Sequence, residues 1–272
     1  MDYKYYLNTS PGHVVAFLDI LGFSAMIKAN DTVESHSKGF VYNLQPIYNG
    51  VLSYFTRERQ KEMGIQFLWV SDSIFIATKI QNVSKLIESV QYVVNQVYCS
   101  NLSLRGGIAT GSLYFETNLW GTSVVNAVAL EGKADMPRII MTKEDFELLS
   151  PYMDKEFWIE DIDYFYLDYF NNIFTQWIAQ GKDLECMLSV YARCIQDNFD
   201  RSNKYEHKKK WSYLANELKR NIIKNSDYIN GHCEYTKKRA EVFSIDTHDK
   251  SNTDIYLSMF NSALLLPEEE PN

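Results

Sequence analysis

The chain has 272 residues, a formal net charge of −8 and 46% hydrophobic residues, a composition that predicts a folded protein with a sizeable core. This acidity argues against a nucleic-acid partner, because proteins that bind nucleic acids cluster Lys and Arg to displace counterions. The four cysteines include no Cys-x-x-Cys pair, which argues against a disulfide framework or a structural zinc site. No apolar run approaches the roughly 20 residues of a membrane helix, so we expect a cytoplasmic protein without a membrane partner.

The first predicted element is a buried strand over residues 13–20, which are apolar and β-branched up to Asp19. Gly22 follows closely, so the strand ends in a tight turn and the aspartate lies at its exit. From residue 32 to 60, apolar residues recur at helical spacing. This spacing predicts one long helix, or two shorter ones, with a kink or break at Pro46.

Two apolar runs, residues 65–70 and 73–78, are separated only by Ser71 and Asp72. This arrangement predicts a β-hairpin with a carboxylate at its tip. The turn lacks the Asn-Gly pair that favours two-residue hairpins, so we expect another interaction to hold it.

The next segments predict a helix over residues 82–98, a glycine-containing strand over 102–115, a helix over 121–135 and a short strand over 138–141. Phosphate-loop fingerprints are absent, so the glycines of the long strand indicate either a close approach of another backbone or a bulge in the strand. The order of elements predicts an α/β sandwich with helices over a mainly antiparallel sheet.

Beyond about residue 155 the pattern changes to mixed polar and apolar helices, predicted near residues 170–198, 204–225 and 253–265. Residues 226–231 and 246–253 are predicted connections. We therefore expect an α/β domain over residues 1–155 and a mostly helical C-terminal region over residues 156–272.

Asp19 and Asp72 are the candidate metal ligands, because each lies in a turn at a strand end. If the strand and the hairpin are neighbours in one sheet, the two carboxylates converge. Hard divalent cations such as Mg²⁺ and Mn²⁺ prefer carboxylate, carbonyl and phosphate oxygens. The Ile20 carbonyl is a further candidate ligand, and the turn at residues 21–24 can offer amides to phosphate. The simpler alternative is that both aspartates are ordinary turn or cap residues.

Four motifs in this order resemble the class III adenylate/guanylate cyclase catalytic domain over residues 13–145. They are AFLDILGF, VSDSIF, LRGGIATG and LWGTSVVNAVALEGKA, beginning at residues 16, 70, 104 and 119. The first two are similar to the family's metal-aspartate motifs, the third to its Arg-x-Gly-Ile-x-x-Gly strand and the last to its Trp-Gly turn and following helix. The resemblance implies a ferredoxin-like βαββαβ fold, two Mn²⁺ or Mg²⁺ ions per site and a homodimer with the site across its interface.

The sequence departs from this family at the positions that read the base and stabilise the transition state. Leu68 stands where adenylate and guanylate cyclases carry a base-reading Lys or Glu. Val125 and Ala129 stand at the asparagine and arginine positions, with Asn126 one place out of register. Asn118 occupies the second base-reading position, where its amide can both donate and accept.

The sequence keeps both aspartates but lacks the residues that recognise a purine base. In this combination it resembles the bacterial pyrimidine cyclases of the Pycsar antiphage system. This resemblance implies conversion of UTP to 3′,5′-cyclic UMP, with cyclic CMP from CTP as the alternative, and a separate effector that binds the product. Phe17 and Leu68 would line the smaller base site. Gly22 and Phe23, in the turn after Asp19, are the further expected substrate contacts.

Arg105 is the candidate for the charge that builds on the α-phosphate, because the usual arginine position holds alanine. The alternative for Arg105 is a structural ion pair, and Arg138 and Lys133 are weaker candidates. Two other functions stay open. A chain of this fold without turnover would be a nucleotide-binding or regulatory module. A polymerase-like or diguanylate-cyclase-like enzyme is disfavoured, because no GGDEF-like hairpin occurs and the acidity of the chain argues against a template strand.

Overall fold

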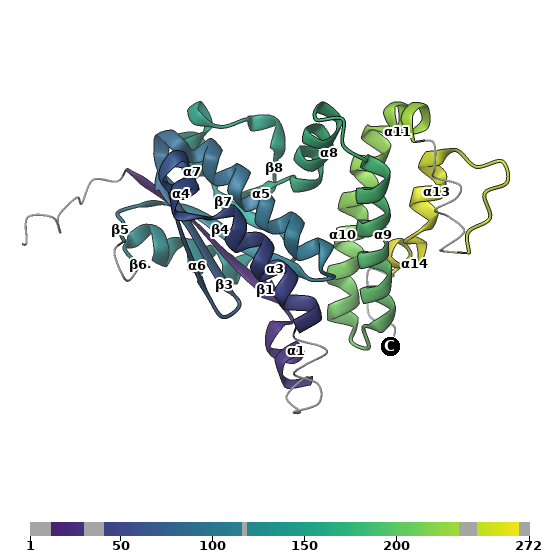
Figure 1. Cartoon of the computed structure of the whole chain (residues 1–272), viewed down its shortest axis with the longest axis horizontal. Coiled ribbons are helices and arrows are strands. Elements are labelled where there is room, and N and C mark those ends of the chain that lie inside the picture. The colour runs from purple at the N-terminus through teal and green to yellow at the C-terminus, as the bar shows by residue number, and fades with distance from the viewer. Residues whose placement is uncertain (1–11, 30–40, 116–118, 234–243, 267–272) are drawn as a thin grey trace, which may run out of the picture. The chain divides into compact units, whose positions relative to one another are not determined.

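The computed structural model describes residues 12–29, 41–115, 119–233 and 244–266, and the chain divides into two compact units at Leu167 and Asp168 (Figure 1). In the described part of the chain, no helix combines the length and the apolar character needed to cross a membrane.

The first half of the N-terminal unit is a βαββαβ arrangement. Its elements are β1 (His13–Leu21), α1 (Phe23–Ala29), α3 (Val41–Tyr54), α4 (Arg57–Met63), β2 (Ile65–Val70), β3 (Ser73–Lys79), a 3₁₀ turn (Ile80–Asn82), α5 (Val83–Cys99) and β4 (Ser103–Gly111). These strands lie in the order β2-β3-β1-β4 with every neighbouring pair antiparallel. The predicted strands, the hairpin and the ferredoxin-like order are confirmed. Pro46 lies inside α3 and does not end it.

The second half of the unit extends the same sheet. Its elements are β5 (Tyr114–Phe115), β6 (Leu119–Trp120), α6 (Thr122–Lys133), β7 (Ile139–Thr142), α7 (Lys143–Leu149), two 3₁₀ turns (Ser150–Tyr152 and Lys155–Phe157), β8 (Trp158–Glu160) and β9 (Tyr164–Leu167). β7 pairs in parallel with β4, and β9 and β8 follow antiparallel, which gives seven strands in the order β2-β3-β1-β4-β7-β9-β8. The sheet therefore continues beyond residue 155, up to Leu167.

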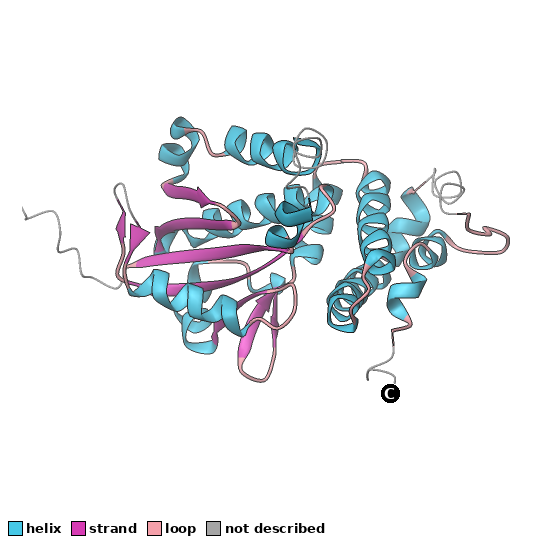
Figure 2. Cartoon of the chain, turned by 90° about the horizontal axis from the view of Figure 1, so that it is seen from below, coloured by secondary structure: helices cyan, strands magenta, loops and turns pink. Residues whose placement is uncertain are grey.

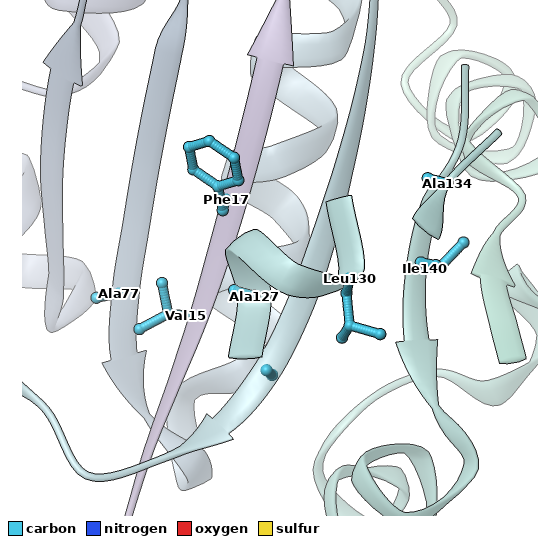
Figure 3. Close-up of a cluster of buried hydrophobic side chains, with 8 residues drawn as sticks. Val15, Phe17, Ala77, Ala127, Leu130, Ala134 and Ile140 are labelled. Carbon is cyan, nitrogen blue, oxygen red and sulfur yellow. The ribbon is translucent and has the colours of Figure 1, made fainter. Parts of the chain in front are cut away.

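Helices cover both faces of the sheet (Figure 2). One face packs against α5, which contacts β1, β3 and β4. On the other face, α6 covers a buried apolar cluster that includes Val15, Phe17 and Ala77 (Figure 3). A Cβ at Gly107 would collide with the Ala127 carbonyl oxygen and with Leu130 of α6. Gly107 thus allows a close approach of the α6 backbone, which is one of the two roles predicted for the glycines of this strand.

The C-terminal unit is helical, as predicted, with α8 (Tyr169–Ala179), α9 (Leu184–Arg201), α10 (Tyr205–Lys224), α11 (Ser226–His232), α13 (Asn252–Ser258) and α14 (Asn261–Leu264). The single helix expected over residues 170–198 is two helices, because Gly181 adopts a φ of 60° that ends the first. The connection expected at residues 226–231 is wrong, since these residues form α11. Its Ser, Asn and Gly residues indicated a loop, but packing against α13 keeps the segment helical.

Candidate active site

The ends of β1 and of the β2–β3 hairpin meet at one end of the sheet. Asp19 pairs in register with Ser73, and the Ile20 backbone N–H donates a 3.0 Å hydrogen bond to the Asp72 carbonyl. Asp19 and Asp72 are both half-buried. The expectation that the strand and the hairpin are neighbours is therefore confirmed, and the two aspartates come from adjacent segments at the same sheet end.

The hairpin turn consists of Ser71 and Asp72, because Val70 pairs directly with Ser73. Ser71 has a φ of 59°, a backbone conformation that glycine adopts easily and serine rarely does. The indole Nε1–H of Trp69 donates a 2.7 Å hydrogen bond to the Ser71 carbonyl. This bond is an interaction of the kind that the sequence required, although Trp69 itself was missed.

The residues at this end of the sheet have the oxygen donors that hard divalent cations prefer. Asp19 and Asp72 supply two carboxylates, and a bound nucleoside triphosphate would supply further oxygens. In the part of the chain that the structure describes, no donor contacts the Asp72 carboxylate, and no group of three or more His, Cys, Asp or Glu side chains is arranged around one metal position. A site formed here depends on the substrate to complete its coordination. Ile20 has a buried side chain, so only its backbone is available to the site.

Arg105 lies beside Asp19, since the two residues are partners in the β1–β4 register. Directly opposite residues in an antiparallel pair share one sheet face, so the guanidinium lies on the same face as the Asp19 carboxylate. Its Nε forms an ion pair with Oε1 of Glu131, whose side chain is 11% exposed. Arg105 therefore forms the structural ion pair that the sequence analysis gave as the alternative to a role on the α-phosphate. Glu131 was missed, although its spacing of four residues from buried Ala127 indicates the inner face of α6.

The weaker basic candidates lie elsewhere. Arg138 forms a 2.6 Å ion pair with Asp161, and its guanidinium lies over the ring of Tyr166. Lys133 is exposed in the last turn of α6. The structure therefore brings only Arg105 of these basic residues into register with Asp19.

An apolar row runs across the sheet one step back from the carboxylates. The row consists of register partners on four neighbouring strands, which are Leu68 on β2, Phe75 on β3, Phe17 on β1 and Gly107 on β4. The rings of Phe17 and Phe75 are 4.8 Å apart between centroids. Phe17 is only 7% exposed and belongs to the core cluster (Figure 3), whereas Leu68 and Phe75 are half-buried. Phe75, which the sequence analysis missed, offers the more accessible ring beside Leu68.

The remaining predicted residues lie on the turn after β1 and on α6. Gly22 is exposed with a φ of 80°, and Phe23 is the half-buried first residue of α1. Val125, Asn126 and Ala129 are all exposed on the outer face of α6. Asn118 lies outside the described residues.

Comparisons with known proteins find similarity at the level of solved structures alone. No model of a known protein family matches the sequence, and no curated protein sequence matches it. Among solved structures, the chain is similar to the catalytic core of a rhodopsin-guanylyl cyclase with converted specificity in complex with ATPalphaS. That match has a TM-score of 0.42 and 11% identity, over 58% of this chain and 95% of that one.

Two adenylyl cyclases are also similar. The adenylyl cyclase CyaB from P. aeruginosa matches with a TM-score of 0.38 and 18% identity, over 57% of this chain and 92% of that one. A bacterial light-regulated adenylyl cyclase matches with a TM-score of 0.38 and 14% identity, over 62% of this chain and 96% of that one. Similarity this distant does not decide an activity.

Proposed function

We propose that this protein is a divalent-metal-dependent nucleotide cyclase that converts UTP into 3′,5′-cyclic UMP and pyrophosphate. The observation that carries the proposal is the hydrogen bond from Ile20 to Asp72, which ties together the two strand ends that bear Asp19 and Asp72. Two carboxylates at adjoining turns, with an arginine in register beside one of them, form a donor set for a metal-bound triphosphate.

In the proposed reaction the ribose 3′ oxygen attacks the α-phosphorus, and the bond from that phosphorus to the bridging oxygen of pyrophosphate breaks. The hydroxyl proton passes to solvent. Two Mn²⁺ or Mg²⁺ ions, held by Asp19, the Ile20 carbonyl and Asp72, would favour ionisation of the hydroxyl and neutralise the leaving pyrophosphate. Arg105 lies on the face where charge develops on the α-phosphate, and Glu131 holds its guanidinium there.

A pyrimidine is the proposed base because the apolar row offers neither Lys nor Glu at position 68. Leu68 and the Phe75 ring form an uncharged surface beside the carboxylates, suited to the face of a small ring. UTP is preferred to CTP on the resemblance to the Pycsar cyclases, and cyclic CMP is the alternative product. The proposed role, cytoplasmic signalling in antiphage defence through a separate cyclic-nucleotide-binding effector, rests on the same resemblance.

A homodimer is part of the proposal. Trp120, Val125 and Val128 expose 57%, 67% and 40% of their surface on β6 and α6. Exposed apolar residues gathered on neighbouring elements are typical of interaction surfaces. A second copy on this face would cover them and place the outer side of α6, with Asn126, at the interface.

A second candidate is a nucleotide-binding module without turnover. Val125 and Ala129 replace the expected transition-state asparagine and arginine, and Arg105 is already paired with Glu131. Such a protein would bind a triphosphate tightly and release no cyclic product.

The test incubates purified protein with each of the four ribonucleoside triphosphates and Mn²⁺, and identifies products by mass spectrometry. Asp72→Asn is the inactive control, and Asp163→Asn, an exposed aspartate in the β8–β9 turn, is the matched active one. A cyclic pyrimidine nucleotide that only Asp72→Asn abolishes supports the proposal. Triphosphate binding without any cyclic product favours the binding module.

A further inference from the structure

We propose that Trp69 is a positioning residue, which fixes the direction of the Asp72 side chain by hydrogen bonding to the Ser71 carbonyl. The inference rests on the proposed function, because it concerns a carboxylate that would hold the metal. It assigns a role to a side chain that neither the metal ligands nor the base site includes.

The two peptide groups that flank Asp72 are each held by a hydrogen bond. The Ser71 carbonyl belongs to the peptide before Asp72 and accepts from Trp69 Nε1 at 2.7 Å. The Asp72 carbonyl belongs to the peptide after it and accepts from the Ile20 N–H at 3.0 Å. Because peptide groups are planar, fixing both planes fixes the direction of the Cα–Cβ bond between them. Ile20 directly follows Asp19, so its bond also relates the two carboxylate-bearing residues to each other.

The Trp69 bond matters because this turn is strained. Ser71 keeps a φ of 59°, although a side chain disfavours that conformation. Such a residue stays in place only where its surroundings hold it, and the indole supplies a bond on its carbonyl. The Trp69 ring packs against Tyr48 of α3, and the two ring centroids are 5.3 Å apart.

The side chain of Asp72 has no second support among the described residues, since no donor there contacts its carboxylate. Its direction therefore depends on its own backbone. Loss of the indole bond frees the peptide before Asp72 to rotate, and the carboxylate then samples directions away from the metal position. The affinity for the metal should fall, because a preorganised ligand loses less entropy on binding.

The experiment measures binding of Mn²⁺ alone, from the electron paramagnetic resonance signal of the free ion, together with the melting temperature. Trp69→Phe keeps a ring against Tyr48 and removes the N–H donor. We expect Mn²⁺ affinity to fall about fivefold, the size of one lost hydrogen bond. Ser71→Gly should raise the melting temperature, because glycine adopts the positive φ without strain. In the Ser71→Gly background, Trp69→Phe should weaken Mn²⁺ binding by less than about twofold.

The matched control removes a hydrogen bond from the opposite end of the same hairpin. Thr78 Oγ1 donates to the Gly64 carbonyl at 2.6 Å, and Thr78→Val deletes this bond. We expect Thr78→Val to lower the melting temperature and to leave Mn²⁺ affinity unchanged. Asp72→Asn gives the background from other Mn²⁺ sites.

The outcomes separate this inference from the proposed function. Equal Mn²⁺ affinity for Trp69→Phe and the wild type overturns the positioning role. A wild type that binds Mn²⁺ no better than Asp72→Asn overturns both the metal site and the positioning role. If Trp69→Phe weakens Mn²⁺ binding as expected but the wild type cyclises none of the four triphosphates, the cyclase proposal fails and the positioning role stands.

Discussion

Asp72 and Asp168 both follow the end of a strand, yet the structure treats their carboxylates in opposite ways. Asp168 is 7% exposed and its carboxylate is fully engaged. Its Oδ1 accepts from the Asn171 backbone at 3.2 Å and from Asn221 Nδ2 at 3.0 Å, and its Oδ2 pairs with Arg220 at 3.0 Å. Asp72 is held through its backbone, with no donor on its carboxylate among the described residues.

The comparison shows how two aspartates in similar sequence settings differ in use. A carboxylate whose oxygens are taken up by the protein stabilises the fold and has little left for a ligand. A carboxylate whose backbone is fixed and whose oxygens stay open can bind a cation. Asp168 is therefore expected to affect stability, and Asp72 to affect activity.

The largest effect is expected from Asp72→Asn. The change removes the charge and keeps the shape, so cyclase activity should fall at least about a hundredfold while the melting temperature stays within about 2 °C. Product formation checks the predicted loss of activity, and thermal unfolding of the same preparation checks the predicted melting temperature. A large loss of stability would place Asp72 in the same class as Asp168.

Asp168→Ala should destabilise the protein by about 2 kcal/mol, because it removes one acceptor from Asn221 and one from Arg220 in a buried place. The side chain of Arg220 is 39% exposed and keeps Glu217 as a partner, which limits the loss. Urea unfolding measures the change, with Asp163→Ala, an exposed aspartate, as the control. Equal midpoints for the two variants would contradict the structural role of Asp168.

Asp145→Ala should cost about 1.5 kcal/mol, and it extends the comparison into the sheet unit. Asp145 accepts from the Thr110 backbone at 3.1 Å, and from the Thr110 and Thr142 hydroxyls at 2.5 and 3.1 Å. Mn²⁺ affinity should not change, because these bonds lie away from the hairpin tip. Urea unfolding measures the change in stability, with Asp135→Ala, at an exposed aspartate, as the control. If Asp145→Ala is as stable as this control, Asp145 does not stabilise the fold.

The smallest effect is expected from His13, at the other end of β1 from Asp19. Burial, and then the charge of Lys79, lower the pKa of His13 from 6.5. The unfolded chain then takes up a proton first as the pH falls below about 6.5, so stability decreases toward acid pH. His13→Gln should flatten this decrease. Melting temperatures between pH 5 and pH 8 check the difference, and parallel profiles for His13→Gln and the wild type would contradict it.

Much of the sheet unit could be predicted because its patterns are local. The continuous apolar run of β1 and the two apolar runs around Ser71 and Asp72 define three strands, and the two-residue connection pairs the last two with each other. The meeting of Asp19 with Asp72 needed only the further assumption that β1 lies beside the hairpin. Gly107 indicated a close approach, but the sequence does not say that α6 is what approaches.

The rest depended on contacts between segments far apart in the sequence. Glu131 reaches Arg105 because α6 packs on β4, and Asp168 meets Asn221 because α8 packs near α10. The hydrogen bond from Trp69 to Ser71 is local, but it depends on a positive φ at Ser71. The conformational preferences of serine do not predict a positive φ. The helix at residues 226–232 was missed because its Ser, Asn and Gly residues favour turns when they are not packed.

The parallel pairing between β4 and β7, through Gly106 with Ile139 and Gly107 with Ile140, has a consequence for biosynthesis. A ribosome releases the chain from its N-terminus, so β1 to β4 emerge before any of α6 or β7. The segments that carry Asp19, Asp72 and Arg105 are then complete, while Glu131 is not yet present. Synthesis of α6 supplies Glu131 to Arg105 and covers the apolar face that includes Val15 and Phe17.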